Sequence, residues 1–176
     1  MSLTPPFTKE SANAKVKKAQ DLWNGQHPQT IAKAYTADSI WRNRSTFLEG
    51  TAAIEQFLTQ KWEKEKSYRL RKELFAFTDD KIAVQFWYEY QDAHDGMKWK
   101  RCYGLEDWTF AEDGKMRKRQ MSGNDIEISE TGESSQEYLY SIVVFRMVDR
   151  LLRICLDRWF KDGVDVNEVE ISEAHW

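Results

Sequence analysis

Apolar and polar residues alternate with a period of two over the middle of the chain, from Tyr68 to Asp125. Short polar turns rich in Asp and Gly separate the alternating runs. This pattern predicts β-strands joined by hairpins. Three or four long strands are expected, over Tyr68–Thr78, Lys81–Tyr90, Trp99–Phe110 and Met116–Asp125. Large aromatic residues occupy both sets of alternate positions, so both faces of the sheet are expected to be covered.

The residues before the sheet follow a helical period instead. Apolar side chains recur every three or four residues in Lys9–Asn24 and again after Thr51, which is expected to cap the third helix. A shorter helix over Gln29–Tyr35, an extended piece over Ser39–Arg44 and a turn at Phe47–Gly50 are expected between them. The predicted fold class is α+β, with three N-terminal helices on one face of a strongly curved antiparallel sheet. Such a sheet leaves a cone-shaped hollow, a usual place for a small-molecule pocket.

Composition narrows the classes of function. At 176 residues with a net charge of −3, the chain fits one domain and gives no sign of a nucleic-acid or membrane partner. The short polar N-terminus is unlike a signal peptide, and the two cysteines make no disulfide framework, so a reducing, cytoplasmic location is expected. The sequence has no Gly-rich phosphate loop and no set of metal ligands at the required spacing, so neither a cofactor nor a metal is expected.

Several motifs occur in a fixed order along three quarters of the chain. They are Pro6-Phe7-Thr8, Trp23-Asn24, Tyr35–Ser39, Trp41–Arg44, Phe57–Trp62, Lys72–Phe77, Arg101, Tyr103-Gly104, Glu106, Trp108, Met116-Arg117 and Asn124-Asp125. In these motifs the chain resembles the nuclear transport factor 2-like (SnoaL-like) superfamily, and within it an uncharacterised family. The resemblance implies a cone-shaped α+β barrel and a homodimer formed through the open sheet face. It implies no single chemistry, because the superfamily includes isomerases, dehydratases, cyclases, hydrolases and non-enzymatic binders.

The motifs divide the chain into a flexible lead (1–8), the superfamily domain (9–130), an atypical insertion (131–156) and a tail (157–176). The insertion has apolar residues at helical spacing, which predicts an amphipathic helix packed on the domain. An alternative is a translated intron, because codons for Gly132-Glu133-Ser134 and Leu156-Asp157 can match splice-donor and splice-acceptor sequences. One uninterrupted messenger RNA covering the segment would contradict the intron hypothesis.

Trp41-Arg42-Asn43-Arg44 is the most unusual run of the sequence. On a strand, the two arginines face one way and Trp41 and Asn43 the other. A buried arginine needs a carboxylate partner, so the run predicts either a clamp for a ligand anion or carbonyl, or a structural salt-bridge network. The resemblance adds that related isomerases and dehydratases place a catalytic Asp near this point. Asn43 or Arg44 stands there instead, so that base is missing.

A substitute base would have to come from the sheet. Glu73, Glu89 and Glu106 are the candidates if burial raises their pKa, and Glu106 is singled out because it shares a strand face with Trp108. The hydroxyl of Tyr103 or Tyr88 would polarise a carbonyl. A solvated Glu106 and tyrosines with a purely structural role are the competing interpretation. Glu106 and Tyr103 are thus the predicted catalytic residues. The predicted ligand-binding residues are Trp41, Arg42, Asn43, Arg44, Trp62, Glu73, Tyr88 and Trp108.

Three functions remain open at this point. The first is a cofactor-independent enzyme of isomerase, dehydratase or cyclase type acting on a small carbonyl or aromatic compound. The second is a carrier of a small-molecule ligand without turnover, and the third is a dimeric protein-interaction module. A closed pocket with Arg and Glu on opposing walls and a raised carboxylate pKa would favour the enzyme. A hollow filled by the protein's own side chains would favour the interaction module.

Overall fold

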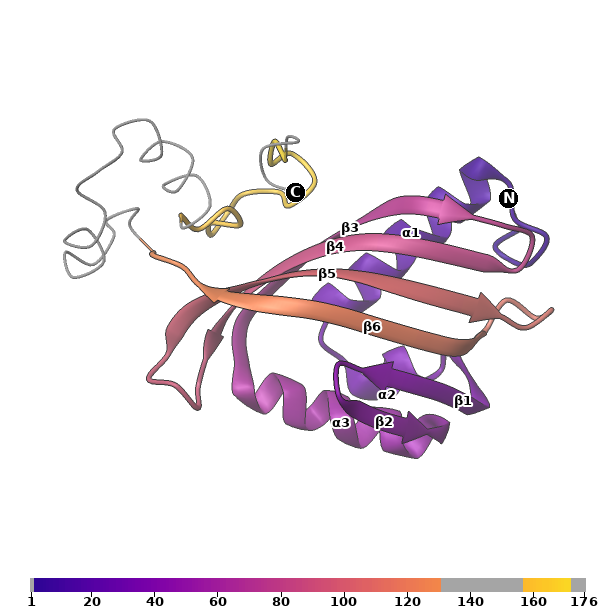
Figure 1. Ribbon diagram of the computed structural model, residues 1–176, viewed down its shortest axis with the longest axis horizontal. Helices are drawn as coiled ribbons and strands as arrows, with labels where there is room; N and C mark the ends of the chain where they lie inside the picture. Colours follow the sequence, from indigo (N-terminus) through magenta and orange to yellow (C-terminus); the bar gives the residue numbers. More distant parts are fainter. Residues whose placement is uncertain (1, 131–156, 172–176) are drawn as a thin grey trace.

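The computed structural model describes residues 2–130 and 157–171 of the chain. The elements are α1 (Lys9–Asn24), α2 (Pro28–Ala32), β1 (Tyr35–Asn43), β2 (Thr46–Glu49), α3 (Gly50–Lys64), β3 (Glu65–Phe77), β4 (Lys81–Asp92), β5 (Lys98–Phe110) and β6 (Met116–Glu127). The predicted α+β class is confirmed: three helices precede the long strands and lie on one face of a curved sheet (Figure 1).

The six strands form one open sheet in the order β2-β1-β6-β5-β4-β3. Strands β3 to β6 make the predicted antiparallel meander, whereas β1 pairs with β6 in parallel. The sheet is therefore not purely antiparallel, and it does not close into a barrel because β2 and β3 remain as edges. The parallel pairing brings Trp41 beside Arg119 and Asn43 beside Met121, which places the Trp41–Arg44 run alongside β6, the last strand of the meander.

The short elements differ most from the sequence-based prediction. Helix α1 has the expected bounds, and Thr8 caps it in a reciprocal capping box with Ser11. Helix α2 ends at Ala32, and the expected turn after Arg44 is strand β2. Thr51 does not cap α3, because the helix begins one residue earlier, at Gly50, and Glu49 holds the cap position without a side-chain hydrogen bond.

The main core lies between the helices and the concave face of the sheet, the face on which α1 to α3 pack. Its buried aromatic side chains come from α1, β1, α3 and the meander. One close approach depends on a glycine. A Cβ on Gly104 would lie 2.1 Å from the ring of Phe86, so only glycine lets that ring lie against β5. This packing helps to bring α1 and the sheet together around a small polar centre.

Residues 157–171 pack on the opposite, convex face of the sheet. Phe160 and Val166 form a second apolar cluster there with Trp87. The predicted insertion, 131–156, lies outside the described residues, but residues that flank it on either side are close together. Ser129 and Asp157 form a parallel bridge, and the Arg158 N–H donates to the Ser129 carbonyl at 3.1 Å. The described part of the tail therefore begins beside Ser129, two residues after the end of β6.

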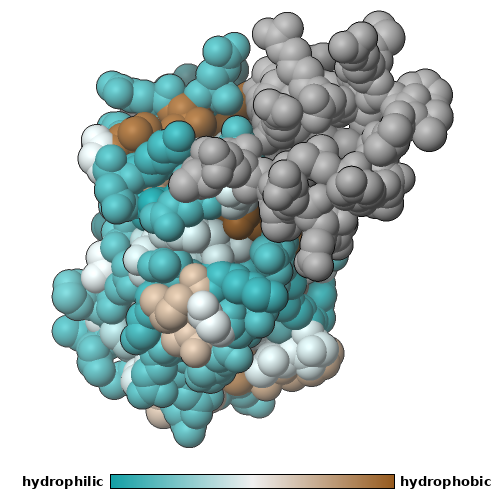
Figure 2. Space-filling view, turned by 90° about the vertical axis from the view of Figure 1, so that its left-hand side faces the viewer, coloured by the Kyte–Doolittle hydropathy of each residue, from teal (hydrophilic) through white to brown (hydrophobic). Residues whose placement is uncertain are grey.

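The end of the molecule that carries the β4–β5 turn is mostly hydrophilic, with several smaller apolar areas (Figure 2). Charged residues of the turn pair with one another: Lys100 Nζ lies 2.9 Å from carboxylate oxygens of both Asp92 and Asp95. Among the described helices, none is long and apolar enough to cross a membrane.

Candidate functional site

A buried ion cluster occupies the middle of the hollow between helices and sheet. Glu106 on β5 accepts from Lys72 on β3 (Nζ to Oε1, 2.9 Å) and from Arg119 on β6 (2.6 Å to Oε1 and 3.3 Å to Oε2). The indole N–H of Trp108 donates to the same carboxylate at 2.6 Å. All three charged side chains are at most 3% exposed. The cluster thus holds two cations and one anion away from water.

Aromatic rings surround both cations. Lys72 Nζ lies 5.6 Å from the ring centre of Trp23 and 5.3 Å from that of Trp108, and the Arg119 guanidinium lies 4.7 Å from Trp23 and 4.8 Å from Trp41. The faces of these rings attract positive charge and compensate part of the lost hydration. The site is therefore suited to holding an excess of positive charge without a second carboxylate.

The electrostatics of the cluster oppose the prediction made for Glu106. Burial alone would raise the pKa of Glu106, but Arg119 and Lys72 lower it to about 2. The ionised carboxylate accepts hydrogen bonds from four donors on its two oxygens, and its low pKa makes it a weak proton acceptor at neutral pH. Burial lowers the pKa of Lys72 to about 8, because Glu106 only partly offsets the loss of water. The group in this cluster that titrates near neutrality is the amine.

A void of about 10 Å³ lies beside the cluster, roughly the space of one water molecule. Tyr68 and Tyr88 line its other side, and Lys61 on α3 lies over both tyrosine rings at 5.0 and 4.4 Å. Lys61 also pairs with Glu65 at the junction of α3 and β3. Burial raises the pKa of the Glu65 carboxyl even though Lys61 opposes this shift.

The Trp41–Arg44 run is divided between the two faces of the sheet. The Asn43 side chain accepts from Arg119 at 3.2 Å and lines the void, whereas Arg42 points to the other face and donates to the Ser122 hydroxyl at 3.2 Å. The prediction that Arg42 and Arg44 share a face is therefore wrong. Strand β1 ends at Asn43, and Arg44 has a positive φ of 57°, which turns its guanidinium back toward Tyr88. Arg44 pairs with Asp125 at 2.7 Å and is not among the residues that line the void.

The other predicted site residues lie at different places. Tyr88 lines the void, and Trp108 binds Glu106. Trp62 is buried on α3 with its ring 6.2 Å from that of Tyr68. Tyr103 and Glu73 lie on the convex face: Tyr103 accepts from Arg101, and Glu73 pairs with Arg71. The structure therefore brings only some of the predicted residues together.

Three charged residues of the site were not predicted. Lys72 and Arg119 meet Glu106 only because the pairing of β3 to β6 puts them on neighbouring rows of one face, and no pattern within a single segment shows this. Glu65 lies at the junction of α3 and β3, so neither the helical nor the strand period of apolar residues predicts which way its side chain points. Its one sequence signal is the four-residue spacing from Lys61.

Comparison with known families agrees with the fold. Residues 5–136 match the model of a family described as "Protein of unknown function (DUF1348)". The match covers most of the chain. The protein belongs to this family. The predicted membership of an uncharacterised family is thereby confirmed.

Two solved structures show how the family relates to proteins of the same fold. One is the epoxide hydrolase/cyclase-like enzyme SalBIII, with 14% identity and a TM-score of 0.58 over 66% of this chain and 93% of that one. The other is the BvnE pinacolase from Penicillium brevicompactum, with 12% identity and a TM-score of 0.57 over 66% of this chain and 84% of that one. At these identities they show the fold alone. No curated protein matches the sequence. Within the described ranges, no group of three or more His, Cys, Asp or Glu side chains is placed to hold a metal ion.

Proposed function

We propose that this protein binds a small carbonyl compound in the hollow of the sheet and transfers a proton on it, with Lys72 as the transferring group. The observation that carries the proposal is the Lys72 amine itself. It is 1% exposed, borders the void and has a pKa of about 8, close to a working pH. Groups with such a pKa transfer protons most effectively near neutrality.

The neighbours of Lys72 fit this chemistry. When a proton leaves the carbon beside a carbonyl, negative charge develops on the carbonyl oxygen, and Arg119 supplies a fixed positive charge to stabilise it. Glu106 positions both cations, because its carboxylate binds each of them. The Glu65 carboxyl with its raised pKa lies behind Lys61 and serves as a second proton carrier. The two structural neighbours are also named as enzymes, an epoxide hydrolase/cyclase-like enzyme and a pinacolase.

A substrate must displace side chains to enter, because the void holds only one water molecule. Lys61 and Met121 line it, and both are long and unbranched. Such side chains change rotamer at low cost and refill a space when the ligand leaves. The proposal therefore requires Lys61 or Met121 to move on binding.

Deuterium exchange tests the proposed chemistry without a known substrate. Small ketones and 2-oxo acids are incubated with the protein in D2O, and NMR follows loss of the C–H signal beside the carbonyl. We expect faster exchange for at least one compound, and Lys72→Met is expected to reduce that rate by at least about 100-fold, the usual contribution of a positioned acid or base. The pH profile should show a group near 8 that the variant lacks.

Lys66→Met is the matched control, because Lys66 lies near the start of the same strand and is exposed. Its exchange rate should equal that of the wild type. Exchange that is no faster than in buffer for every compound, or that persists unchanged in Lys72→Met, would rule out this function.

A second candidate function is a dimeric interaction module. It is favoured because side chains of the protein fill the hollow around Lys72, apart from the void of about 10 Å³. The convex face also carries exposed apolar residues that the tail leaves uncovered: Ile40 and Leu105 are 52% exposed and Phe47 is 74% exposed. Exposed apolar groups of this kind mark interaction surfaces. The proposed occupant is a second copy of the chain, as in the expected homodimer.

Light scattering after size-exclusion chromatography tests the homodimer. The wild type is expected to show twice the mass of one chain, and Leu105→Lys to shift the protein to the monomer at the same concentration, because a charge would be buried without a partner. A wild-type protein that is monomeric over the whole accessible concentration range would contradict the proposal.

A further inference from the structure

A second hollow lies at the other side of the aromatic wall, between α1, α2 and the β5–β6 turn. It has a volume of about 280 Å³, far more than the void beside Lys72. Trp23 lines both spaces, and Trp108 lines this one while its indole N–H binds Glu106. Phe110 and Met116 complete an apolar floor. The hollow has the size and lining of a site for a small ligand with a flat apolar body.

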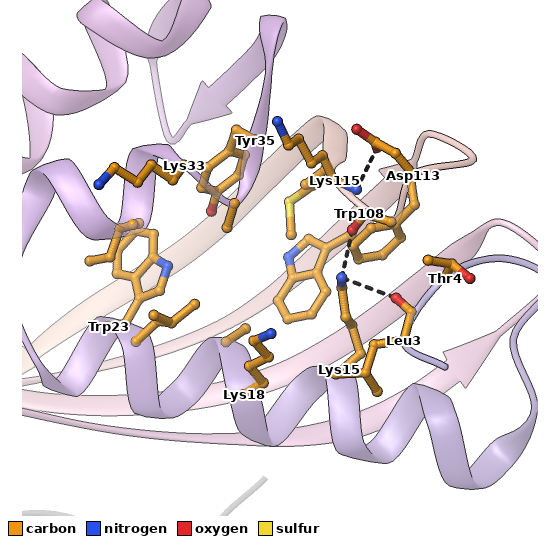
Figure 3. A pocket seen from close by; sticks show the side chains of 17 residues that line it. Leu3, Thr4, Lys15, Lys18, Trp23, Lys33, Tyr35, Trp108, Asp113 and Lys115 are labelled. Carbon is orange, nitrogen blue, oxygen red and sulfur yellow. Dashed lines mark hydrogen bonds between the residues drawn. The ribbon is translucent and has the colours of Figure 1, made fainter. Parts of the chain in front are cut away.

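The rim of this hollow is strongly basic. Four lysines line it, Lys15, Lys18, Lys33 and Lys115, against a single acidic residue, Asp113 (Figure 3). None of the four forms a salt bridge with a residue in the part of the chain that the structure describes. They come from α1, from the segment before β1 and from the β5–β6 turn, so segments far apart in the sequence place like charges around one opening.

Lys15 is held in position inside the wall. Its amine donates to the carbonyl of Gly114 at 2.5 Å and to that of Leu3 at 3.2 Å, and it lies 5.0 Å above the ring of Phe110. Backbone carbonyls orient the amine but do not neutralise it. Gly114 has a positive φ of 79°, and a Cβ there would lie 2.9 Å from the Leu3 carbonyl, so glycine is needed for this close approach. Burial also lowers the pKa of Lys15 to about 8, because the amine loses part of its hydration.

We infer that this hollow binds a small organic anion, with a single flat apolar ring inside the hollow and a carboxylate or phosphate group at the lysine rim. The apolar floor removes the ring from water, and the anionic group of the ligand supplies the negative charge that the lysine rim lacks. The site is separate from the cluster around Glu106, so it does not depend on the proposed proton transfer.

Binding of three matched probes to the full chain tests the inference. Benzoate and phenyl phosphate carry the two anionic groups, and benzamide is the neutral equivalent of benzoate. Titrations followed by calorimetry and by tryptophan fluorescence are expected to show binding of at least one anion, at least tenfold tighter than benzamide. Affinity should fall as salt is raised, because the rim lysines are open to solvent. The tighter of the two anions identifies the head group.

Two variants locate the binding. Lys18→Met/Lys115→Met removes rim charge and is expected to weaken anion binding at least tenfold. Ala19→Leu fills the hollow without changing charge and is expected to weaken benzoate and benzamide alike. Lys9→Met, on the exposed start of α1, is the charge control and should bind as the wild type does. Equal affinity for benzoate and benzamide, no binding of either anion, or unchanged binding in Ala19→Leu would overturn the inference.

Discussion

Replacing Glu106 with Gln is expected to lower the free energy of unfolding by about 3–5 kcal/mol, because the change leaves the Lys72 and Arg119 charges buried without the carboxylate that neutralises them. Lys72→Met should behave very differently. It removes the surplus cation and keeps the Glu106 to Arg119 pair, and Met has a similar shape, so a loss of no more than about 1.5 kcal/mol is expected. Chemical denaturation of both variants at neutral pH gives the comparison.

The same cluster predicts how stability depends on pH. Glu106 has a pKa of about 2 in the folded protein against an ordinary value of 4.5, so the unfolded chain takes up the proton first as pH falls. Its contribution, about 3 kcal/mol, is present above pH 4.5 and is lost toward pH 2. The Lys72 pKa is lowered instead, so its effect on stability is unfavourable below about pH 8 and is relieved as pH rises toward 10.

Comparison of variants isolates these contributions. Lys72→Met should lose the part of the alkaline rise in stability that Lys72 causes, and Glu106→Gln should lose much of the acid dependence. Arg119→Met would remove the bidentate partner of Glu106 and is the natural third member of the cycle. If Glu106→Gln and Lys72→Met destabilise the protein equally, the cluster does not hold a surplus buried cation, and the case for Lys72 as the proton carrier weakens with it.

The sequence predicted elements well where one period continued over many residues. Helix α1 and the strands of the meander have nearly the expected bounds, and Glu106 shares a face with Trp108 as alternation requires. Short elements were harder. Arg44 is a single residue with a positive φ, and β2 has only four residues. Both are too short for a periodic pattern of apolar residues to predict their conformation.

The site was harder to predict than the fold for a physical reason. The pKa of Glu106 depends on Lys72 and Arg119, which are 34 residues before it and 13 after it and meet it only through strand register. The sequence suggested desolvation by Trp108, which is real, but it did not show the two cations that outweigh it. The alternation of apolar and polar residues predicts the face of the sheet on which a side chain lies. Its neighbours on adjacent strands depend on how the strands pair, which the alternation does not show.

A second buried carboxylate predicts a large effect at the convex face. Glu89 is fully buried, and its oxygens accept from Arg101 at 2.5 Å and from the backbone N–H groups of Trp159 and Phe160 at 2.7 and 2.8 Å. One side chain thus joins the sheet to the tail. Glu89→Gln is expected to destabilise docking of the tail by about 3–5 kcal/mol, because the buried Arg101 loses the negative charge of Glu89 and one tail N–H loses its acceptor.

The loss should be local before it is global. The tail residues pack outside the main core, in the separate cluster of Phe160, Val166 and Trp87, so they can leave while the helices stay on the sheet. Hydrogen exchange over 157–171 and limited proteolysis should therefore increase strongly in Glu89→Gln. Glu127→Gln, at an exposed carboxylate on β6, is the control. Unchanged exchange over 157–171 would show that Glu89 does not hold the tail.

Release of the tail also bears on assembly, because the tail covers part of the face through which a second copy is proposed to bind. The Arg158 guanidinium lies 3.6 Å from the ring centre of Trp99, and Trp159 packs against Arg101 and Tyr103. If the tail and a partner chain use overlapping parts of this face, Glu89→Gln should increase self-association. If they use separate parts, the mass in solution should stay the same while exchange over 157–171 rises. Measuring both in one variant therefore shows whether the tail restricts the dimer surface or only completes the fold.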